Sequence, residues 1–380
     1  MLLFGVLLTL AGTLVPMALV PSASIAPSVE MGSLAGPLGN TFHPGVILSG
    51  GSNGTASFLG GIGVYDKPTD FSLPVLAGLS IGPTGPRVQN WTPAIASEFA
   101  QGGVYGIGWN GSTWLFGGQR FAGGSNMGAL VTLRDGTTTN WSEGVAGFFG
   151  GGGIFSIGWN GTAWLIGGNS TQGPVLLSWE GGVFRDLSGR LVGHEPRGWV
   201  QLLEWNGAEW LVGGGGIFGL LRGAEYSDLI PRSPIVGNGV FSGAWTGTSW
   251  IVGGFGGRLG IVEGPSSAVV PLPIPAEYSQ MVTLVVIDAD GSLLVGGRGV
   301  GPTGGDTPVL LQSSGMGAGV LWTDLSGRIP VDFAGGEIQG AVPAPFLGTD
   351  AYWIVGEGNY NLTTGHGVGA LGLLAWGPGP

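Results

Sequence analysis

The chain of 380 residues contains no cysteine, one lysine and three histidines. The absence of cysteine excludes disulfides, thiolate metal sites and thiol nucleophiles. The single lysine, Lys67, removes the Walker-type phosphate loop and lysine Schiff-base chemistry elsewhere in the chain. His43, His194 and His366 form no metal-binding spacing. We therefore expect no metal, no cofactor and no catalytic constellation.

Charge is also scarce, because only 9% of the residues are Asp, Glu, Lys or Arg. The 12 basic residues are scattered singly among 23 acidic ones, which gives a formal net charge of -11. A nucleic-acid partner is not expected, since counterion release needs a clustered basic surface. So few charged groups also predict tolerance of acidic surroundings, because few paired carboxylates can be lost to protonation.

Glycine and proline, in contrast, are abundant, at 82 and 25 residues. Such a content is typical of disorder or collagen. Disorder conflicts with the 43% hydrophobic content and the 15 tryptophans, and the glycines lack the three-residue period of collagen. The composition predicts a globular fold with many tight turns and few helices, because glycine is unfavourable inside a helix.

The first 26 residues look like a targeting segment. Residues 2–20 form an apolar run, and small residues of the kind that signal peptidases cut follow at 21–26. We predict a signal peptide or N-terminal membrane anchor over 1–26, with cleavage favoured over anchoring, and one domain over 27–380. The expected location is extracellular or at the cell surface, and any membrane contact would be through this segment alone.

A repeated motif organises the rest of the chain. Its pattern, Trp-x-Gly-x-x-Trp followed by two apolar residues and a glycine doublet, begins at Trp109, Trp159, Trp205 and Trp245. Degenerate copies bring the doublets or their remnants to positions 60, 117, 167, 213, 253, 296 and 356, a mean spacing of about 49 residues. Each unit contains four short strand patterns, and Asn110-Gly111 is typical of a type I′ hairpin turn. The predicted fold is all-β, a seven-bladed β-propeller of four-stranded antiparallel blades.

The last unit ends one strand short. The segment before the first unit, around Val29 to Leu38, could supply that outer strand. Pairing of the N-terminal and C-terminal segments would close the ring and leave no open sheet edge.

The doublet and its period resemble the kelch and galactose-oxidase-like propeller repeats, over most of residues 46 to 376. The Trp-Asn-Gly-x-x-Trp-Leu-x-Gly-Gly form is more similar to secreted prokaryotic propeller repeats. The resemblance implies a fold and no activity. The copper and cross-linked cysteine of galactose oxidase are impossible in a chain without cysteine.

Two sets of residues are candidates for ligand binding. The first tryptophan of each motif could stack on a sugar, although packing between blades is favoured because the pairs recur at one repeat position. Three Asp-Leu-x-x-Arg segments end the fourth strands, and their arginines could clamp a ligand, although turn capping by the aspartate is favoured. The ligand-binding candidates are Trp109, Trp159, Trp205, Trp245, Arg190, Arg232 and Arg328.

We therefore expect an exported, non-enzymatic binding or scaffold module that recognises glycans or cell-envelope proteins through rim loops. The alternative is a hydrolase or lyase acting on polysaccharide. It requires two carboxylates converging at the propeller channel. The candidates for that role are Glu195, Glu204, Glu337 and Asp332.

Overall fold

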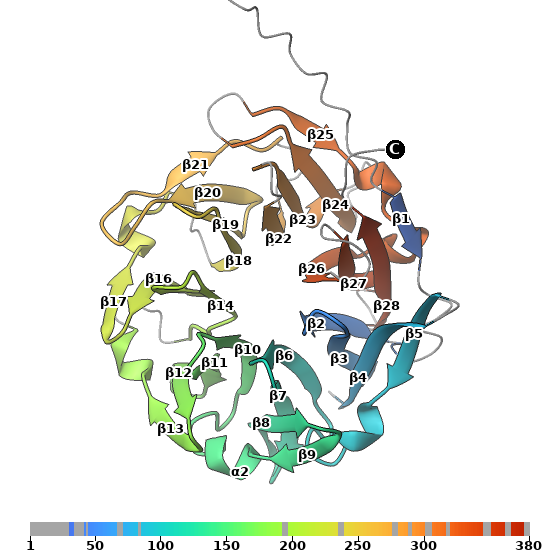
Figure 1. Ribbon diagram of the computed structural model, residues 1–380, viewed down its shortest axis with the longest axis vertical. Helices are drawn as coiled ribbons and strands as arrows, with labels where there is room; N and C mark the ends of the chain where they lie inside the picture. The colour runs from blue at the N-terminus through green and yellow to red at the C-terminus, as the bar shows by residue number, and fades with distance from the viewer. Residues whose placement is uncertain are drawn as a thin grey trace, which may run out of the picture.

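Seven four-stranded antiparallel sheets stand radially around a central axis (Figure 1). The computed structural model describes residues 30–33, 42, 45–66, 71–82, 85–191, 197–234, 239–275, 280–287, 291–300, 306–316, 320–344, 351–361 and 366–375. This arrangement confirms the predicted seven-bladed β-propeller. The targeting segment predicted over 1–26 lies outside these residues, and so do His43 and His194.

Blades are numbered here in chain order. Blade 1 contains β2 (Val46–Ser52), β3 (Ser57–Asp66), β4 (Phe71–Gly82) and β5 (Gly85–Asn90). Blade 2 contains β6 (Gly103–Trp109), β7 (Trp114–Ala122), β8 (Ser125–Arg134) and β9 (Thr137–Asn140). Blade 3 contains β10 (Gly153–Trp159), β11 (Trp164–Ser170), β12 (Gly173–Glu180) and β13 (Val183–Asp186). Blade 4 contains β14 (Leu202–Trp205), β15 (Trp210–Gly214), β16 (Ile217–Arg222) and β17 (Glu225–Asp228).

The remaining blades follow the same order. Blade 5 contains β18 (Val240–Trp245), β19 (Trp250–Gly254), β20 (Arg258–Val262) and β21 (Val270–Leu272). Blade 6 contains β22 (Met281–Ile287), β23 (Leu293–Val300), β24 (Asp306–Ser313) and β25 (Trp322–Asp324). Blade 7 contains β26 (Glu337–Pro343), β27 (Ala351–Asn361), β28 (His366–Ala375) and β1 (Glu30–Ser33). The short helical segments are η1 (Thr92–Ala94), α2 (Ser142–Val145), η2 (Ser188–Arg190), η3 (Ile230–Arg232), η5 (Ser326–Arg328) and η6 (Val331–Phe333).

Strand β1 closes the ring. It pairs antiparallel with β28, from Glu30 opposite Ala375 to Ser33 opposite Gly372. The predicted N-terminal strand is therefore confirmed within the predicted range. The closure joins the two ends of the chain through backbone hydrogen bonds and covers the edge of β28.

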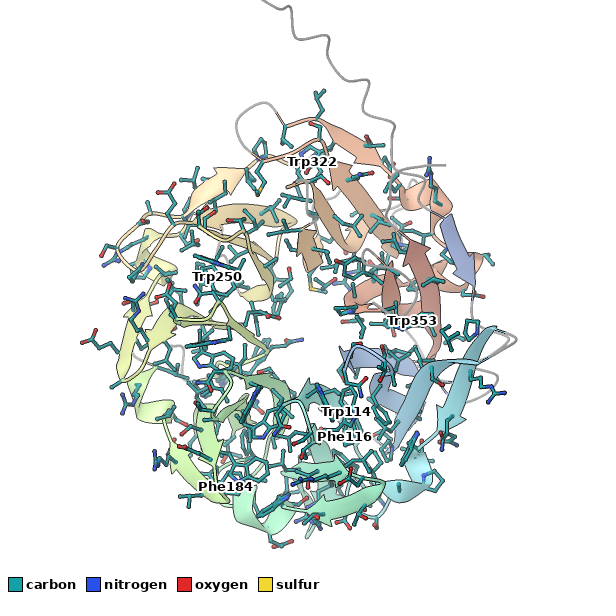
Figure 2. The ribbon with its side chains drawn as sticks, viewed as in Figure 1. Trp114, Phe116, Phe184, Trp250, Trp322 and Trp353 are labelled. Carbon is teal, nitrogen blue, oxygen red and sulfur yellow. The ribbon has the colours of Figure 1, made fainter. Side chains whose placement is uncertain are left out.

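The second strand of each blade is apolar because both of its faces are covered by neighbouring blades. Every residue of β15 and β19 is buried. Figure 2 shows Trp250 and Trp353, which are almost fully buried, within the ring of blades. This double burial explains why the motif contains consecutive apolar residues instead of an alternating pattern.

The glycine doublets allow two close approaches. A Cβ on Gly118 would lie 1.9 Å from the carbonyl oxygen of Gly103 on the inner strand of the same blade. A Cβ on Gly117 would lie 2.5 Å from Ile154 of the next blade. The doublet therefore sets the spacing both within a blade and between blades.

One turn prediction is wrong. In the hairpin after Trp109, only Gly111 has a positive φ (+96°), whereas a type I′ turn needs two such residues. The loop has four residues, because Trp109 pairs with Trp114 and the backbone N–H of Asn110 donates to Thr113 O over 3.2 Å. Type I′ geometry occurs instead between β8 and β9, where Asp135 and Gly136 both have positive φ.

Candidate functional site

The inner strands of the blades carry the side chains that face the central channel. In six blades the inner strand contains a register shift that leaves one residue unpaired, and in blade 4 Gln201 occupies the equivalent position just before β14. A bulge of this kind turns a side chain away from the regular alternation. The seven residues at this position are Leu48, Tyr105, Phe155, Gln201, Phe241, Thr283 and Gln339.

A cavity of about 260 Å³ lies among several of these residues. Because its lining comes from blades 1, 2, 3, 4 and 7, it lies across the axis of the ring, and we call it the channel pocket. It contains two phenyl-type rings, an indole, three amides and a leucine, and no charged group. The lining residues are Leu48, Tyr105, Phe155, Asn169, Trp199, Gln201 and Gln339.

Contacts among the lining residues hold the pocket in shape. The Trp199 indole N–H donates to Gln201 Oε1 over 2.9 Å, which leaves the amide nitrogen of Gln201 as a donor. The rings of Tyr105 and Phe155 lie 5.7 Å apart. The Tyr105 hydroxyl donates to Gln119, whose own amide donates to a backbone carbonyl of the next blade. The pocket therefore presents fixed rings and fixed amides to a ligand.

Beside the channel pocket, blades 6 and 7 form a cluster of charged residues, which we call the acidic cluster. It contains Arg298, Asp306, Glu337 and Glu357. Arg298 lies 3.6 Å from Asp306 and 3.4 Å from Glu337. The amide of Gln339 donates to Glu337 and thereby joins the cluster to the channel pocket. Three carboxyl groups thus share one guanidinium.

The carboxyl groups of the cluster have raised pKa values. Burial raises the pKa of Glu337, and Arg298 opposes that effect. Burial, and then the charge of Glu337, raises the pKa of Glu357 to about 7. Glu337 and Glu357 are direct partners in the register of β26 and β27. The backbone therefore holds the two carboxyl groups as neighbours, and ionising one disfavours ionising the other.

The carboxylates proposed for an enzyme do not form a pair in a pocket. Glu195 lies outside the described residues, Asp332 is partly buried in η6, and Glu337 belongs to the acidic cluster. Glu204, on β14, is exposed to solvent. No more than one carboxylate lines the channel pocket or either of the pockets between blades described below. Within the described residues, no group of three His, Cys, Asp or Glu side chains could hold a metal ion.

The four motif tryptophans proposed as ligand-binding residues lie at the ends of the inner strands. The glycine doublets are on the neighbouring strands and pair toward the other end of each inner strand. Each is partly buried and packs on the second tryptophan of its motif, with ring centroids 4.9 to 5.2 Å apart. The second tryptophans are buried between blades. Trp109 lines a pocket between blades 1 and 2, and Trp205 lines the equivalent pocket between blades 3 and 4. Trp159 and Trp245 line neither of these pockets, nor the channel pocket.

The three arginines proposed as ligand clamps lie at the ends of short 3₁₀ segments that follow the outer strands. The guanidinium groups of Arg190 and Arg232 each donate to a backbone carbonyl of the next blade, at Ala224 and Pro265. Arg190 also lines the pocket between blades 3 and 4, and Arg328 ends η5. Arg190 and Arg232 therefore bridge consecutive blades.

The aspartates of the same segments cap the turn, as the structural interpretation proposed. Asp186 Oδ1 accepts the backbone N–H of Ser188 over 2.8 Å, and the same bond recurs at Asp228 and Asp324. The Ser188 hydroxyl then accepts the N–H of Leu176 on the third strand. Asparagine takes the place of aspartate in blades 1 and 2.

The same kind of turn explains five of the seven Asn-x-Ser/Thr triplets in the sequence, which begin at Asn53, Asn90, Asn110, Asn140, Asn160, Asn169 and Asn361. In the triplets that begin at Asn90 and Asn140, the asparagine oxygen accepts the N–H of the Ser or Thr two residues later. The hairpin turns at Asn53, Asn110 and Asn160 contain the same bond. These five triplets are structural features of the repeat.

The channel-facing residues were not among the site residues predicted from the sequence. A signal for them exists, because each lies four residues before the first tryptophan of its motif, as Tyr105 does before Trp109. Across the four complete motifs this position holds Tyr, Phe, Gln and Phe, whereas Gly or Trp recurs at fixed positions around it. A variable position in an otherwise regular repeat is where function can differ from blade to blade.

No protein-family model matches the chain, and the search of curated proteins gave no match. Among solved structures, the chain is similar to YCF48 bound to D1 peptide, with a TM-score of 0.57, 11% identity and coverage of 92% of this chain and 95% of that one. A chain of the Mitotic Checkpoint Complex is similar with a TM-score of 0.57 and 12% identity, and the match covers 96% of this chain and 98% of that one. The computationally designed Ika8 protein is similar with a TM-score of 0.51 and 11% identity, and the match covers 87% of this chain and 83% of that one. At these identities the likeness shows the propeller fold alone.

Proposed function

We propose that the protein is an exported, cell-surface propeller that binds a peptide segment of a partner protein in the channel pocket. The observation that carries this proposal is the pocket's lining, which combines aromatic rings with fixed amide groups from five blades. Amides donate to and accept from a peptide backbone, and the rings give apolar contact to a side chain. A scaffold without a ligand has no need for such groups at its bulges.

The size of the pocket agrees with a peptide. At about 260 Å³ it lies below the range of about 300 to 1,000 Å³ that holds drug-sized ligands, so it has room for one or two residues. The rest of the segment would lie on the surrounding loops. The acidic cluster adjoins the pocket through Gln339, and a basic residue next to the inserted side chain would find an opposite charge there.

Two further observations support the proposal. The propellers similar in fold include one solved with a bound peptide and one solved in a multiprotein complex. Export rests on the apolar run of residues 2–20 and the small residues that follow it. Within the part of the chain that the structure describes, no helix is long and apolar enough to cross a membrane.

Displayed random peptides selected on the purified protein test this function. We expect Phe155→Ala and Gln201→Ala to weaken the selected peptides by about tenfold or more, because these residues supply a ring and an amide to the pocket. Phe241→Ala is the matched control. Phe241 occupies the same repeat position in blade 5, but its ring packs on Phe255 and does not line the pocket.

Enriched peptides that bind wild type and Phe155→Ala equally, or that lose binding as much with Phe241→Ala, would remove the channel pocket as the site. A selection without enrichment would contradict peptide binding itself. Calorimetric titration of a synthetic copy of an enriched peptide gives the affinities that decide between these results.

A further inference from the structure

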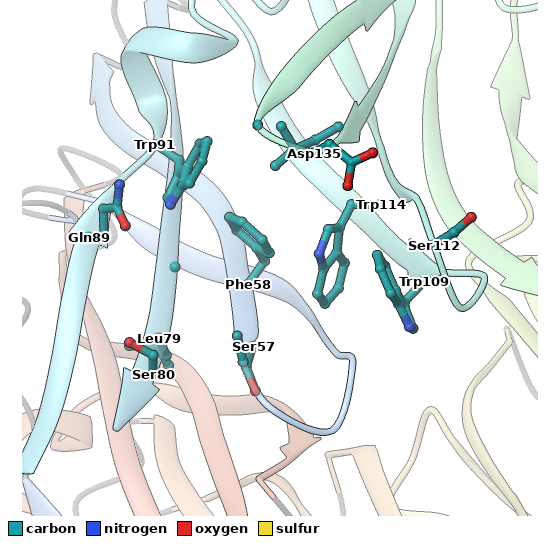
Figure 3. A pocket seen from close by; sticks show the side chains of 14 residues that line it. Ser57, Phe58, Leu79, Ser80, Gln89, Trp91, Trp109, Ser112, Trp114 and Asp135 are labelled. Carbon is teal, nitrogen blue, oxygen red and sulfur yellow. The ribbon is translucent and has the colours of Figure 1, made fainter. Parts of the chain in front are cut away.

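A second cavity lies between blades 1 and 2, at the face that carries the hairpin turns after the inner strands. Its volume is about 280 Å³. Figure 3 shows Trp91 and Trp109 on opposite sides of it, with Phe58 and Trp114 between them. Phe58 and Trp114 are buried and pack edge to face, with centroids 4.9 Å apart, whereas Trp91 and Trp109 are partly exposed. We call this cavity the rim pocket.

The rim pocket has an equivalent between blades 3 and 4. There, Trp205 and Trp210 replace Trp109 and Trp114 in a cavity of about 370 Å³. Leu133 of the rim pocket corresponds to Leu221, because each pairs with the second tryptophan of its motif. The two pockets are therefore the same repeat position in different blades.

The interface between blades 2 and 3 is packed differently at the same position. Trp179 takes the place of Leu133, since it pairs with Trp164 as Leu133 pairs with Trp114. Its ring lies 5.0 Å from that of Trp141 and stacks on Phe184 at 5.4 Å. The indole of Trp179 therefore occupies the space that a leucine leaves open.

A second difference leaves a donor free in the rim pocket. In blade 2 the indole N–H of Trp141 donates to Thr132 Oγ1 over 3.2 Å. In blade 1 the corresponding residues are Trp91 and Gly78, and a Cβ at Gly78 would lie 2.9 Å from Trp91 Nε1. The Trp91 indole N–H makes no hydrogen bond within the described residues, and it lies at the wall of the cavity.

The polar lining of the rim pocket is mostly neutral. It consists of the hydroxyls of Ser57, Ser80 and Ser112, the amide of Gln89 and one exposed carboxylate, Asp135, and the Ser57 hydroxyl already donates to Pro343 O. The equivalent pocket has Arg185 and Arg190 in its lining and Leu187 in place of Trp91. The two cavities therefore differ in charge and in aromatic content.

We propose that the rim pocket binds a single neutral sugar ring of a glycan. A pyranose has a flat C–H face, which stacks on an indole, and a rim of hydroxyls, which pair with Ser, Gln, Asp and indole N–H groups. The two partly exposed indoles supply a stacking surface on either side of the cavity, and the neutral donors and acceptors lie between them. A cavity of this size fits one ring, with the rest of the glycan outside. The site is independent of peptide binding at the channel pocket.

An array of neutral and charged glycans, followed by titration of the best neutral glycan, tests the proposal. Leu133→Trp is the decisive variant, because it places in the rim pocket the residue that fills the interface between blades 2 and 3. We expect it to lower the affinity about tenfold or more. Leu221→Trp makes the same change in the equivalent pocket and should leave binding of this glycan unchanged.

Two exposed positions keep the test valid if Leu133→Trp disturbs packing. Gln89→Ala and Ser112→Ala remove one polar group each without touching the core, and each should weaken binding about threefold or more. The proposal is wrong if no neutral glycan binds, if Leu133→Trp or both alanine variants leave binding unchanged, or if a quaternary ammonium ion competes. The last result would assign the indoles and Asp135 to a cation.

Discussion

Replacement of Glu357 by glutamine should make the protein more stable at alkaline pH and leave its stability in weak acid unchanged. The pKa of Glu357 is raised to about 7, chiefly by burial and then by Glu337. A carboxyl group with a pKa raised by folding binds its proton more tightly in the folded state. The stabilisation that the protonated Glu357 contributes is therefore complete at pH values below its ordinary pKa of 4.5, and it is lost as the pH rises through about 7.

The magnitude follows from the two pKa values. A rise from 4.5 to about 7 corresponds to about 3 kcal/mol at most. Glu357 is partly exposed, and solvent screening reduces the cost of its charge to about 1 to 2 kcal/mol. Glutamine resembles the protonated carboxyl group in shape and in lacking charge. The variant should thus gain about 1 to 2 kcal/mol at about pH 8 and almost nothing at about pH 4.5.

Urea unfolding followed by tryptophan fluorescence, at several pH values between these limits, measures the difference. Glu180→Gln is the control, because it removes the same charge from an exposed hairpin residue and should change stability by less than about 0.5 kcal/mol. Equal stability of wild type and Glu357→Gln at about pH 8 would refute the reasoning. So would a gain by the variant that is the same at every pH. The expected direction agrees with the acid tolerance that the low charge content predicts.

Three further predictions concern the fold. Trp250→Ala should lower the free energy of unfolding by about 3 to 5 kcal/mol, as measured by urea unfolding. Trp250→Phe should lower it by less, because the buried indole N–H has no hydrogen-bond partner within the described residues. An equal loss in the two variants would contradict this account. Gly118→Ala should abolish soluble expression, since its Cβ would lie 1.9 Å from a backbone oxygen. Gly111 has a φ of +96° and open space around it, so Gly111→Ala should lower the free energy of unfolding by about 1 to 2 kcal/mol and still fold. Deletion through Ser33 should lower the melting temperature and promote association through the exposed edge of β28, as measured by scanning calorimetry and light scattering. An unchanged melting temperature and no association would contradict this role of β1.

The blade number and the closure were predictable because they depend on a period and a missing strand. The recurring doublets give the period, and the last unit visibly lacks its fourth strand. The turn after Trp109 was not predictable from Asn-Gly alone. The side chain of Asn110 accepts the N–H groups of Ser112 and Thr113, and these bonds favour a four-residue loop over the two-residue one.

The candidate sites were predictable only in part. Trp109, Trp205 and Arg190 line the two pockets between blades, but Trp159, at the same motif position as Trp109, lines neither of them. The difference comes from Trp179, which is distant in the sequence from Trp159 and packs beside it only in the folded blade. Whether a repeated residue meets a cavity depends on the volume of its neighbours, and a motif contains no information on that volume.

The sequence by itself determined the fold class, the seven blades and the residues that join them, because period, apolar runs and glycine positions are local properties of the chain. The tertiary structure alone decided which side chains meet. Leu48, Tyr105, Gln201 and Gln339 come from four blades, and only closure of the ring brings them to one pocket. Likewise, Glu337 and Glu357 become coupled only when β26 pairs with β27 next to Arg298.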